Sequence, residues 1–305
     1  MPKVSLKHVQ VNSYFSNGFL SIGIYIQDKM AILFDSGNDE NSAKDVLNAL
    51  QADGYQITAI INTHCHPDHC GGNYFFQKKF PELKVYAAPE EREFIENPNL
   101  APRCFCGGAA PFAGLKNKLL APQKPSVITN EITPYQDQTI SIAGADFKII
   151  TLPGHTPGSI GIITPDNVLY AGDALFGTDT LNKHAILFYT DIGNTLVSLQ
   201  KLATLKVDAC VLYHGGVIDN LAHIAQQHET RILETKNTVL SFINQHALSV
   251  DELTQKIMQM HNIPDNIISF TLTQTAMRAY LTQLEYEKAI ELKVSEGLLR
   301  AVAII

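Results

Sequence analysis

The sequence predicts a mixed α/β fold in which stacked sheets are covered by helices, followed by a smaller helical domain. Two observations support this prediction. Over residues 1–218, short strand-like segments alternate with helical ones in the order strands, helix, strands and helices. From about residue 220 the pattern changes to long amphipathic helices and two final short strands. A length of 305 residues is sufficient for one large and one smaller domain, which we expect over residues 1–218 and 219–305.

The first strands are indicated by alternating apolar and polar residues rich in Val, Ile, Tyr and Phe. The segments VSLKHVQVN, LSIGIYIQ and MAILFDSG predict successive antiparallel strands, with turns at residues 16–18 and near 28–29. Residues 41–53 have apolar positions at helical spacing and end at Gly54, a typical helix C-cap position. The apolar strand ITAIINTH follows, and then a helix over residues 72–80 and the strand LKVYAAP.

Residues 97–129 have no clear periodicity and are rich in Pro, Gly, Cys and Lys. A loop of this length inside a compact domain is usually functional or mobile, so we expect an inserted, partly apolar lid. Strands return with QTISIAG, DFKIITLP, SIGIITP and NVLYAGD. Residues 194–205 then predict a helix, and ACVLYHGG predicts one more strand.

The C-terminal domain is predicted to contain three helices, over residues 223–246, 250–260 and 271–285. A Ser-x-x-Glu capping box opens the second of them. The final residues alternate as two short strands around residues 296–297. Three helices followed by a hairpin are typical of a winged helix, and a lid or dimerisation role is the favoured interpretation. A homodimer is therefore a fair expectation.

The charge and composition of the chain limit the kinds of partner that we expect it to bind. The formal net charge of −7 repels polyanions on average, and no basic run stands out. The third C-terminal helix offers only Arg278 and Lys288 as cations, so nucleic-acid binding stays open but is not favoured. No apolar run could span a bilayer, and the N-terminus lacks the apolar core of a secretory signal. We expect a cytoplasmic protein that does not bind a membrane.

The chain has five cysteines, an odd number, so they cannot all form disulfides with one another. Cys65 and Cys70 lie inside a histidine-rich motif, where a disulfide would strain a metal site, and we interpret both as packing residues. Cys104 and Cys106 are separated by a single residue, which is too close for an easy disulfide and only weak evidence for a metal site. Reduced thiols in a reducing compartment are the simpler interpretation.

The segment Thr-His-Cys-His-Pro-Asp-His-Cys-Gly-Gly carries the strongest chemical signal. It places His64, His66, Asp68 and His69 within six residues, directly after an apolar strand. Imidazole and carboxylate groups are good ligands for divalent metals, and a solvated polar loop is rarely so dense in histidine. The motif therefore predicts a metal centre.

Further ligands are needed to complete two coordination spheres. His155, Asp173 and His214 each follow an apolar strand, the position at which the first motif also occurs. A single histidine at a strand end is more often structural. Three such residues after one dense motif favour metal ligation.

This ordered set of seven residues resembles the metallo-β-lactamase superfamily, over about residues 5–218. The resemblance implies an αββα sandwich with two metal ions at one edge of the sheets. It implies that the first ion is held by His64, His66 and His155. It implies that the second is held by Asp68, His69 and His214, with Asp173 bridging the two. Zinc is expected from the histidine count, and iron or manganese are the alternatives.

Asp35 in Phe-Asp-Ser-Gly matches a family position that usually supports the metal loop, although a simple turn aspartate explains it equally well. Two bound metals imply a hydrolase in which a bridging hydroxide attacks a carbonyl or phosphorus centre. Asp68 is the expected catalytic residue, since it could also orient that hydroxide or move its proton.

Positions at which this sequence departs from the patterns of particular subfamilies limit the class of substrate that we expect. Asp173 stands where true lactamases of this fold have cysteine or no bridging residue, and His66 stands where the diiron flavoproteins have glutamate. Phe176 stands where the lactone-hydrolysing branch has tyrosine. The segment AGDALF instead looks like thioester hydrolases of the glyoxalase II type. We expect hydrolysis of a small-molecule ester or thioester; the alternative, suggested by the C-terminal tail, is a lactamase-beta-like endonuclease acting on single-stranded RNA.

Substrate contacts are harder to predict. Phe176 and His184 follow the bridging aspartate closely and are weak candidates for lining the pocket. Arg103, Lys116 and Lys118, in the inserted segment, are candidates for binding an anionic substrate group. A solvated surface is the favoured interpretation for these cations.

Overall fold

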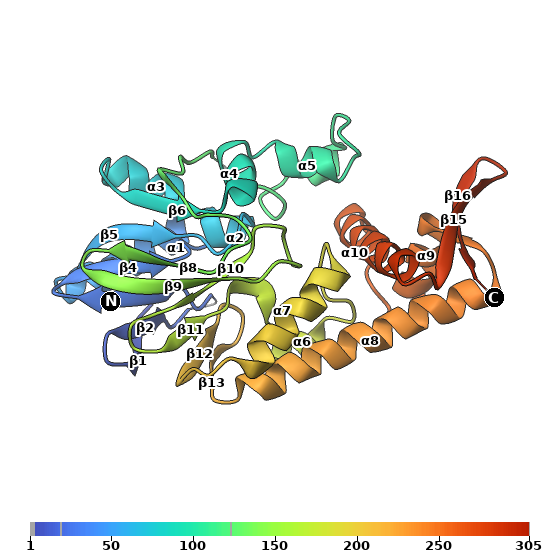
Figure 1. The fold of residues 1–305 in the computed structure, drawn as a ribbon. Helices are drawn as coiled ribbons and strands as arrows, with labels where there is room; N and C mark the ends of the chain where they lie inside the picture. The colour runs from blue at the N-terminus through green and yellow to red at the C-terminus, as the bar shows by residue number, and fades with distance from the viewer. Residues whose placement is uncertain (1–3, 19, 123, 305) are drawn as a thin grey trace.

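A computed structural model describes residues 4–18, 20–122 and 124–304 of the chain (Figure 1). It contains two stacked sheets, as expected. The first sheet has seven strands in chain order: β1 (Leu6–Gln10), β2 (Ser13–Ser16), β3 (Gly23–Gln27), β4 (Met30–Phe34), β5 (Gln56–Ile61), β6 (Lys84–Ala87) and β7 (Asn130–Glu131). Strands β1 to β4 pair antiparallel, and β4 to β7 pair parallel.

The second sheet has six strands in the order β13-β12-β11-β10-β9-β8. Their bounds are β8 (Gln138–Ile142), β9 (Ala145–Thr151), β10 (Ile160–Ile163), β11 (Val168–Tyr170), β12 (Ala209–Leu212) and β13 (Gly216–Ile218). Aromatic side chains fill the space between the sheets, where Phe147 packs edge-on against Tyr25 and Phe34. Gly23 leaves room for the ring of Tyr170, because a Cβ there would lie 2.3 Å from a ring atom.

Helices cover the outer faces of both sheets. Apolar residues of α1 (Glu40–Ala52) and α3 (Asn73–Lys79) pack on the first sheet, and those of α7 (Ile192–Thr204) pack on the second. Asp39 caps α1 by accepting hydrogen bonds from two backbone N–H groups, and Gly54, with φ of 78°, follows its end. The mixed α/β sandwich predicted from the sequence is confirmed.

The C-terminal part contains the three expected helices and the hairpin: α8 (Leu221–Gln245), α9 (Val250–Met260), α10 (Ile267–Tyr286), β15 (Ile290–Ser295) and β16 (Leu298–Ala303). A short strand, β14 (Leu248–Ser249), joins β16 to give a sheet in the order β14-β16-β15. Helix α10 begins earlier than expected because Asn266 caps it. Helix α8 runs from the sheets into the C-terminal lobe (Figure 1). One apolar cluster continues across residue 218, so the domain boundary stays a prediction.

Several elements differ from the sequence-based expectation. The chain reverses at Val11, where φ is 32°, so β2 pairs back on β1 and the first expected strand is shorter. Helices α4 (Pro89–Glu96) and α6 (Thr178–Lys183) were not expected, and neither was β13. The segment 97–129 is largely irregular but contains α5 (Leu100–Cys104) and a 3-10 turn, η1 (Ala113–Leu115). Among the described residues, no helix is long and apolar enough to cross a membrane.

Candidate metal centre

The histidine motif begins just after β5 ends, and Asp35 accepts hydrogen bonds from two of its residues. Asp35 follows the parallel neighbour β4 and is 1% exposed. Its carboxylate accepts hydrogen bonds from the backbone N–H of Thr63 at 2.8 Å, the hydroxyl of Thr63 at 2.8 Å and Nδ1 of His69 at 2.7 Å. Asp35 therefore connects the end of one strand to the loop that follows the next, which fits the supporting role implied by the resemblance.

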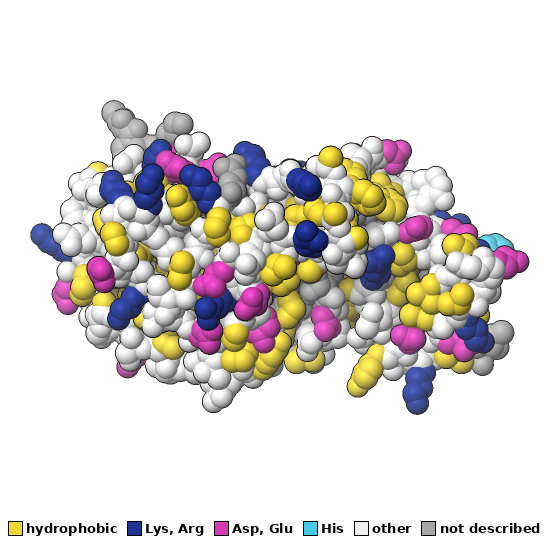
Figure 2. Space-filling view, turned by 90° about the horizontal axis from the view of Figure 1, so that it is seen from above, with side chains coloured by type: hydrophobic (Ala, Val, Ile, Leu, Met, Phe, Trp, Pro, Cys, Tyr) yellow, Lys and Arg dark blue, Asp and Glu magenta, His cyan; other side chains and the backbone are white. Residues whose placement is uncertain are grey.

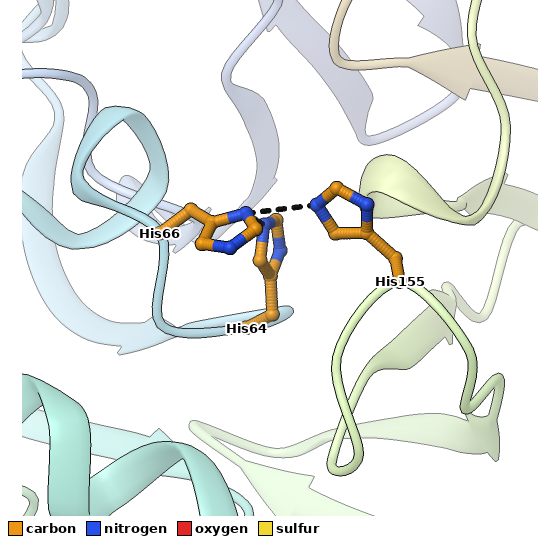
Figure 3. A group of neighbouring side chains, drawn as sticks. All are labelled: His64, His66 and His155. Atoms are coloured by element: carbon orange, nitrogen blue, oxygen red, sulfur yellow. Dashed lines mark hydrogen bonds between the residues drawn. The ribbon is translucent and has the colours of Figure 1, made fainter. Parts of the chain in front are cut away.

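Three imidazole rings converge at one end of the motif (Figure 3). Nδ1 of His66 lies 3.0 Å from Nε2 of His64 and 2.8 Å from Nε2 of His155. Nδ1 of His155 lies 2.8 Å from the carbonyl oxygen of Phe188, to which it donates, so its Nε2 presents a lone pair. Burial, and then the neighbouring His66, lower the pKa of His155 to about 4, which keeps the ring neutral and able to bind a metal.

A second group forms around Asp68, His69 and His214. Oδ2 of Asp68 lies 3.1 Å from Nε2 of His214 and 3.8 Å from Nε2 of His69. The ring of Tyr213 stacks on His69 with a centroid distance of 3.8 Å, and its hydroxyl donates to the carbonyl oxygen of Asp68. The ring and the turn of the short helix α2 (Pro67–Cys70) are thereby held in one orientation.

Asp173 lies between the two groups. Its Oδ2 is 3.5 Å from Nε2 of His155, and its Oδ1 is 3.2 Å from Nε2 of His69 and 3.6 Å from Nε2 of His214. It sits in the turn η2 (Gly172–Ala174) after β11. Gly172 has φ of 53°, and a Cβ there would lie 2.7 Å from the hydroxyl oxygen of Thr63, so glycine is needed at this position.

The donor atoms fit bound cations. Nε2 of His69 and Oδ1 of Asp173 are buried and have no hydrogen-bond partner within the described part of the chain. Buried polar atoms are normally satisfied, and a metal ion between imidazole and carboxylate groups would satisfy these. Burial alone would raise the pKa of Asp173, but the neighbouring His69, His214 and His155 hold it well below its usual range, so the carboxylate is ionised.

Two buried residues support the centre without having been identified from the sequence. The first is Glu91, in the first turn of α4. Its Oε2 accepts from the backbone N–H of Cys65 at 2.8 Å, and its Oε1 accepts from the N–H of Gly158 at 2.8 Å. The side chain thus ties the loop of His64 and His66 to the loop that follows His155. Its position in an acidic run on a helix gave no local signal.

The second is His228, on α8. Its Nδ1 donates to the carbonyl oxygen of Ile224 at 2.8 Å, and its Nε2 accepts from the backbone N–H of Phe176 at 2.9 Å. Burial lowers the pKa of His228 to about 4, so it remains a neutral acceptor. The C-terminal helix therefore holds the segment that follows Asp173. The signal in the sequence was a histidine in register with the apolar face of an amphipathic helix.

The weaker candidates for substrate contacts do not all lie at the metal centre. Phe176 is buried, with ring centroids 6.0 Å from His155 and 6.2 Å from His214. His184 is exposed at the end of α6, and Arg103 is exposed in α5 beside a cavity that none of the seven metal-site residues lines. Among the described residues, Cys104 and Cys106 belong to no potential metal-binding group.

Cys65 and Cys70 lie inside the motif but outside the potential metal-binding groups of the described chain. Burial, and then nearby carboxylates, raise the pKa of both thiols well above the usual value. The Sγ of Cys70 donates to the carbonyl oxygen of Cys65. Both thiols thus stay protonated, in keeping with packing residues.

The fold and these convergent histidine and aspartate side chains are typical of a metal-binding protein. A model of the Metallo-beta-lactamase superfamily matches residues 20–214, and the chain belongs to this superfamily. It is 29% identical over 191 residues to a hydroxyacylglutathione hydrolase from Synechococcus, covering 60% of each chain. It is 28% identical over 215 residues to a probable metallo-hydrolase from Methanocaldococcus jannaschii, covering 68% of this chain and 92% of the other. The matches span about half to three fifths of the length of the hydroxyacylglutathione hydrolases.

Solved structures share the fold, including the C-terminal part. A beta-lactamase domain protein from Burkholderia ambifaria superposes with a TM-score of 0.76 at 15% identity, covering 98% of this chain and 93% of the other. A metallo-beta-lactamase family protein from Thermus thermophilus gives 0.71 at 19% identity, covering 100% and 99%. A metallo-beta-lactamase from Pontibacter korlensis, with a TM-score of 0.58 and 14% identity, covers 76% of this chain and 99% of its own.

Proposed function

We propose that this chain is a two-metal hydrolase that cleaves a small-molecule ester or thioester. The observation that carries the proposal is the position of Asp173, whose two carboxylate oxygens face different groups of histidine nitrogens. Hydrolases that act with two metals commonly place a bridging ligand between them. The similarity to hydroxyacylglutathione hydrolases, whose names describe thioester cleavage, supports the choice of substrate class.

The proposed first metal site consists of His64, His66 and His155. The proposed second site consists of Asp68, His69 and His214, with Asp173 shared by the two sites. Bound divalent cations would supply Lewis acidity toward the carbonyl oxygen and make a water nucleophilic near neutral pH. Zinc suits a donor set so rich in imidazole, and iron or manganese are the alternatives.

Substrate access is proposed on the side of Asp68 and His214. Their side chains are 33% and 21% exposed, whereas those of His69 and Asp173 are 0% and 7% exposed. Burial would raise the pKa of Asp68, but the neighbouring His69 and His214 lower it, so its carboxylate is ionised near neutral pH. An ionised Oδ2 at the open edge can accept a proton from the attacking water and return it to the leaving group. Phe176 lies on the buried side, where its ring packs near His155 and His214.

Metal analysis and a substrate panel test the proposal. We expect about two metal ions per chain under replete conditions and hydrolysis of thioesters in preference to lactones and single-stranded RNA. Asp68→Asn should lower kcat by about two orders of magnitude or more, with metal content measured alongside. Cleavage of RNA alone, abolished by the same substitution, would show that the thioesterase assignment is wrong. Fewer than about one metal per chain would contradict the two-metal centre.

A homodimer in the cytoplasm is part of the same proposal. The C-terminal lobe supports it through exposed apolar side chains on β15 and β16, including Val294, Leu298 and Leu299. Light scattering during size exclusion measures the assembly directly. The mass of a single chain at micromolar concentration would contradict the dimer.

A further inference from the structure

A cavity of about 840 Å³ lies in the inserted segment, outside the metal centre. Its lining residues all fall between Glu96 and Pro125, and five of them are prolines. Because proline fixes φ, the walls lose less conformational entropy when a ligand binds than a flexible loop would. The volume is within the range of small-molecule sites.

The lining is positively charged in a chain whose net charge is −7. Arg103, Lys116 and Lys118 line the cavity and are exposed. None of the three side chains forms an ion pair or hydrogen bond with the described residues. Lys and Arg side chains are also visible near the middle of the face seen in Figure 2, where α5 lies in Figure 1.

Glu96 is the one acidic lining residue among the described part of the chain, and its carboxylate is already engaged. Its Oε1 accepts from the backbone N–H of Ile128 at 2.8 Å, and its Oε2 pairs with Nε of Arg92 at 3.1 Å. Three cations therefore face the cavity without a protein counter-charge. This arrangement is suited to an anionic ligand.

Helix α4 connects this cavity to the metal centre. Glu91, near its start, bonds the backbone of the metal loop at Cys65, and Glu96, at its end, lines the cavity. Five residues of helix advance about 7.5 Å, which is the axial distance from Glu91 to Glu96. The insert also abuts the C-terminal lobe, since a Cβ on Gly114 would lie 2.7 Å from Cγ2 of Ile267.

We propose that this cavity binds a phosphate-bearing group, the anionic arm of the substrate that is cleaved at the metal centre; this assignment of the arm rests on the proposed function. Three positive charges match a ligand with several negative charges better than a single carboxylate. Arg103 can form paired hydrogen bonds with phosphate oxygens, and the two lysines add point charges. The side-chain amides of Asn97 and Asn99 lie in the same lining as neutral donors and acceptors.

Binding is tested first, with ADP as the probe and calorimetry on the metal-loaded full chain. The variant Arg103→Ala/Lys116→Ala/Lys118→Ala changes exposed side chains, so it should fold normally. We expect it to bind ADP at least about 10-fold more weakly than the wild type, with the difference shrinking at high salt. Lys206→Ala, an exposed lysine outside the lining, is the matched control and should bind as the wild type does. Equal ADP affinity in the triple variant and the wild type would overturn the proposal.

Steady-state kinetics then test whether the group bound in the cavity is part of the substrate. The triple variant should raise KM for acetyl-coenzyme A, a thioester on a phosphorylated carrier, by at least about 10-fold and leave kcat unchanged. KM for S-methyl thioacetate, which is uncharged, should not change. A KM effect confined to a glutathione thioester, which carries carboxylates, would show that the phosphate assignment is wrong. If no thioester is hydrolysed but ADP affinity still depends on the cavity, the proposed function fails and the phosphate site stands.

Discussion

Replacement of Glu91 by alanine tests how the two ligand loops are held together. The side chain is 1% exposed and accepts two hydrogen bonds of 2.8 Å, from the backbone N–H groups of Cys65 and Gly158. Hydrogen bonds to a charged group contribute about 1.5–3 kcal/mol each, and the loss here leaves two buried N–H groups without partners. We therefore expect Glu91→Ala to destabilise the fold by roughly 3–5 kcal/mol.

The expected change in melting temperature follows from the size of the protein. At about 2–4 °C per kcal/mol for a large domain, Tm should fall by roughly 6–20 °C. Since the two loops carry His64, His66 and His155, affinity for the first metal ion should also fall by about 10–100-fold. Thermal unfolding of metal-free protein gives the first quantity, and titration with a zinc-competing chelator gives the second.

A matched control separates these bonds from general effects on α4. Glu93 lies on the same helix, is exposed and has no side-chain hydrogen bond within the described chain, so Glu93→Ala should leave Tm and metal affinity nearly unchanged. Glu91→Gln keeps the shape but offers one oxygen, and it should fall between the wild type and Glu91→Ala. If Glu91→Ala melts within about 2 °C of the wild type and binds metal equally well, the loops are not held in this way.

Three further predictions concern other parts of the centre. Gly154→Ala would place a Cβ 2.6 Å from Cα of Thr195 at φ of 139°, and should cost at least about 3 kcal/mol in denaturant unfolding. Gly54→Ala, at φ of 78° with nothing within 4 Å, should cost only about 1 kcal/mol, and equal losses would refute the steric explanation. Asp35→Asn removes the charge that orients His69, so stepwise metal titration should show the second site weakened more than the first. Burial holds the pKa of His228 at about 4, below its ordinary value, so the unfolded chain takes up a proton at higher pH than the folded chain does. The stability that this residue contributes is therefore lost as the pH falls from about 6.5 to 4, by up to roughly 3 kcal/mol. His228→Gln should flatten that part of the pH profile, and an unchanged slope would contradict the assignment.

The sequence by itself indicated seven residues that the structure brings together in three neighbouring groups, and their role as metal ligands stays a prediction. Each follows an apolar strand, and parallel strands such as β4 and β5, or β11 and β12, present their C-terminal ends at the same edge of a sheet. Alternation and helical periodicity predicted most of the core elements, and the capping box of α9 is formed as expected. These features are encoded locally, within a few residues of one another.

Other features depend on residues that are distant in the sequence. Glu91 connects Cys65 to Gly158, and His228 reaches Phe176 from a C-terminal helix. A buried hydrogen bond of this kind is specified by the packing of whole elements, so no local pattern reveals it. The sequence likewise named the cations of the inserted segment as candidates for binding an anion, but it did not show whether they share one site. Only the tertiary structure shows that Arg103 lines a single cavity with two lysines and no free carboxylate among the described residues, because folding alone determines which charges become neighbours.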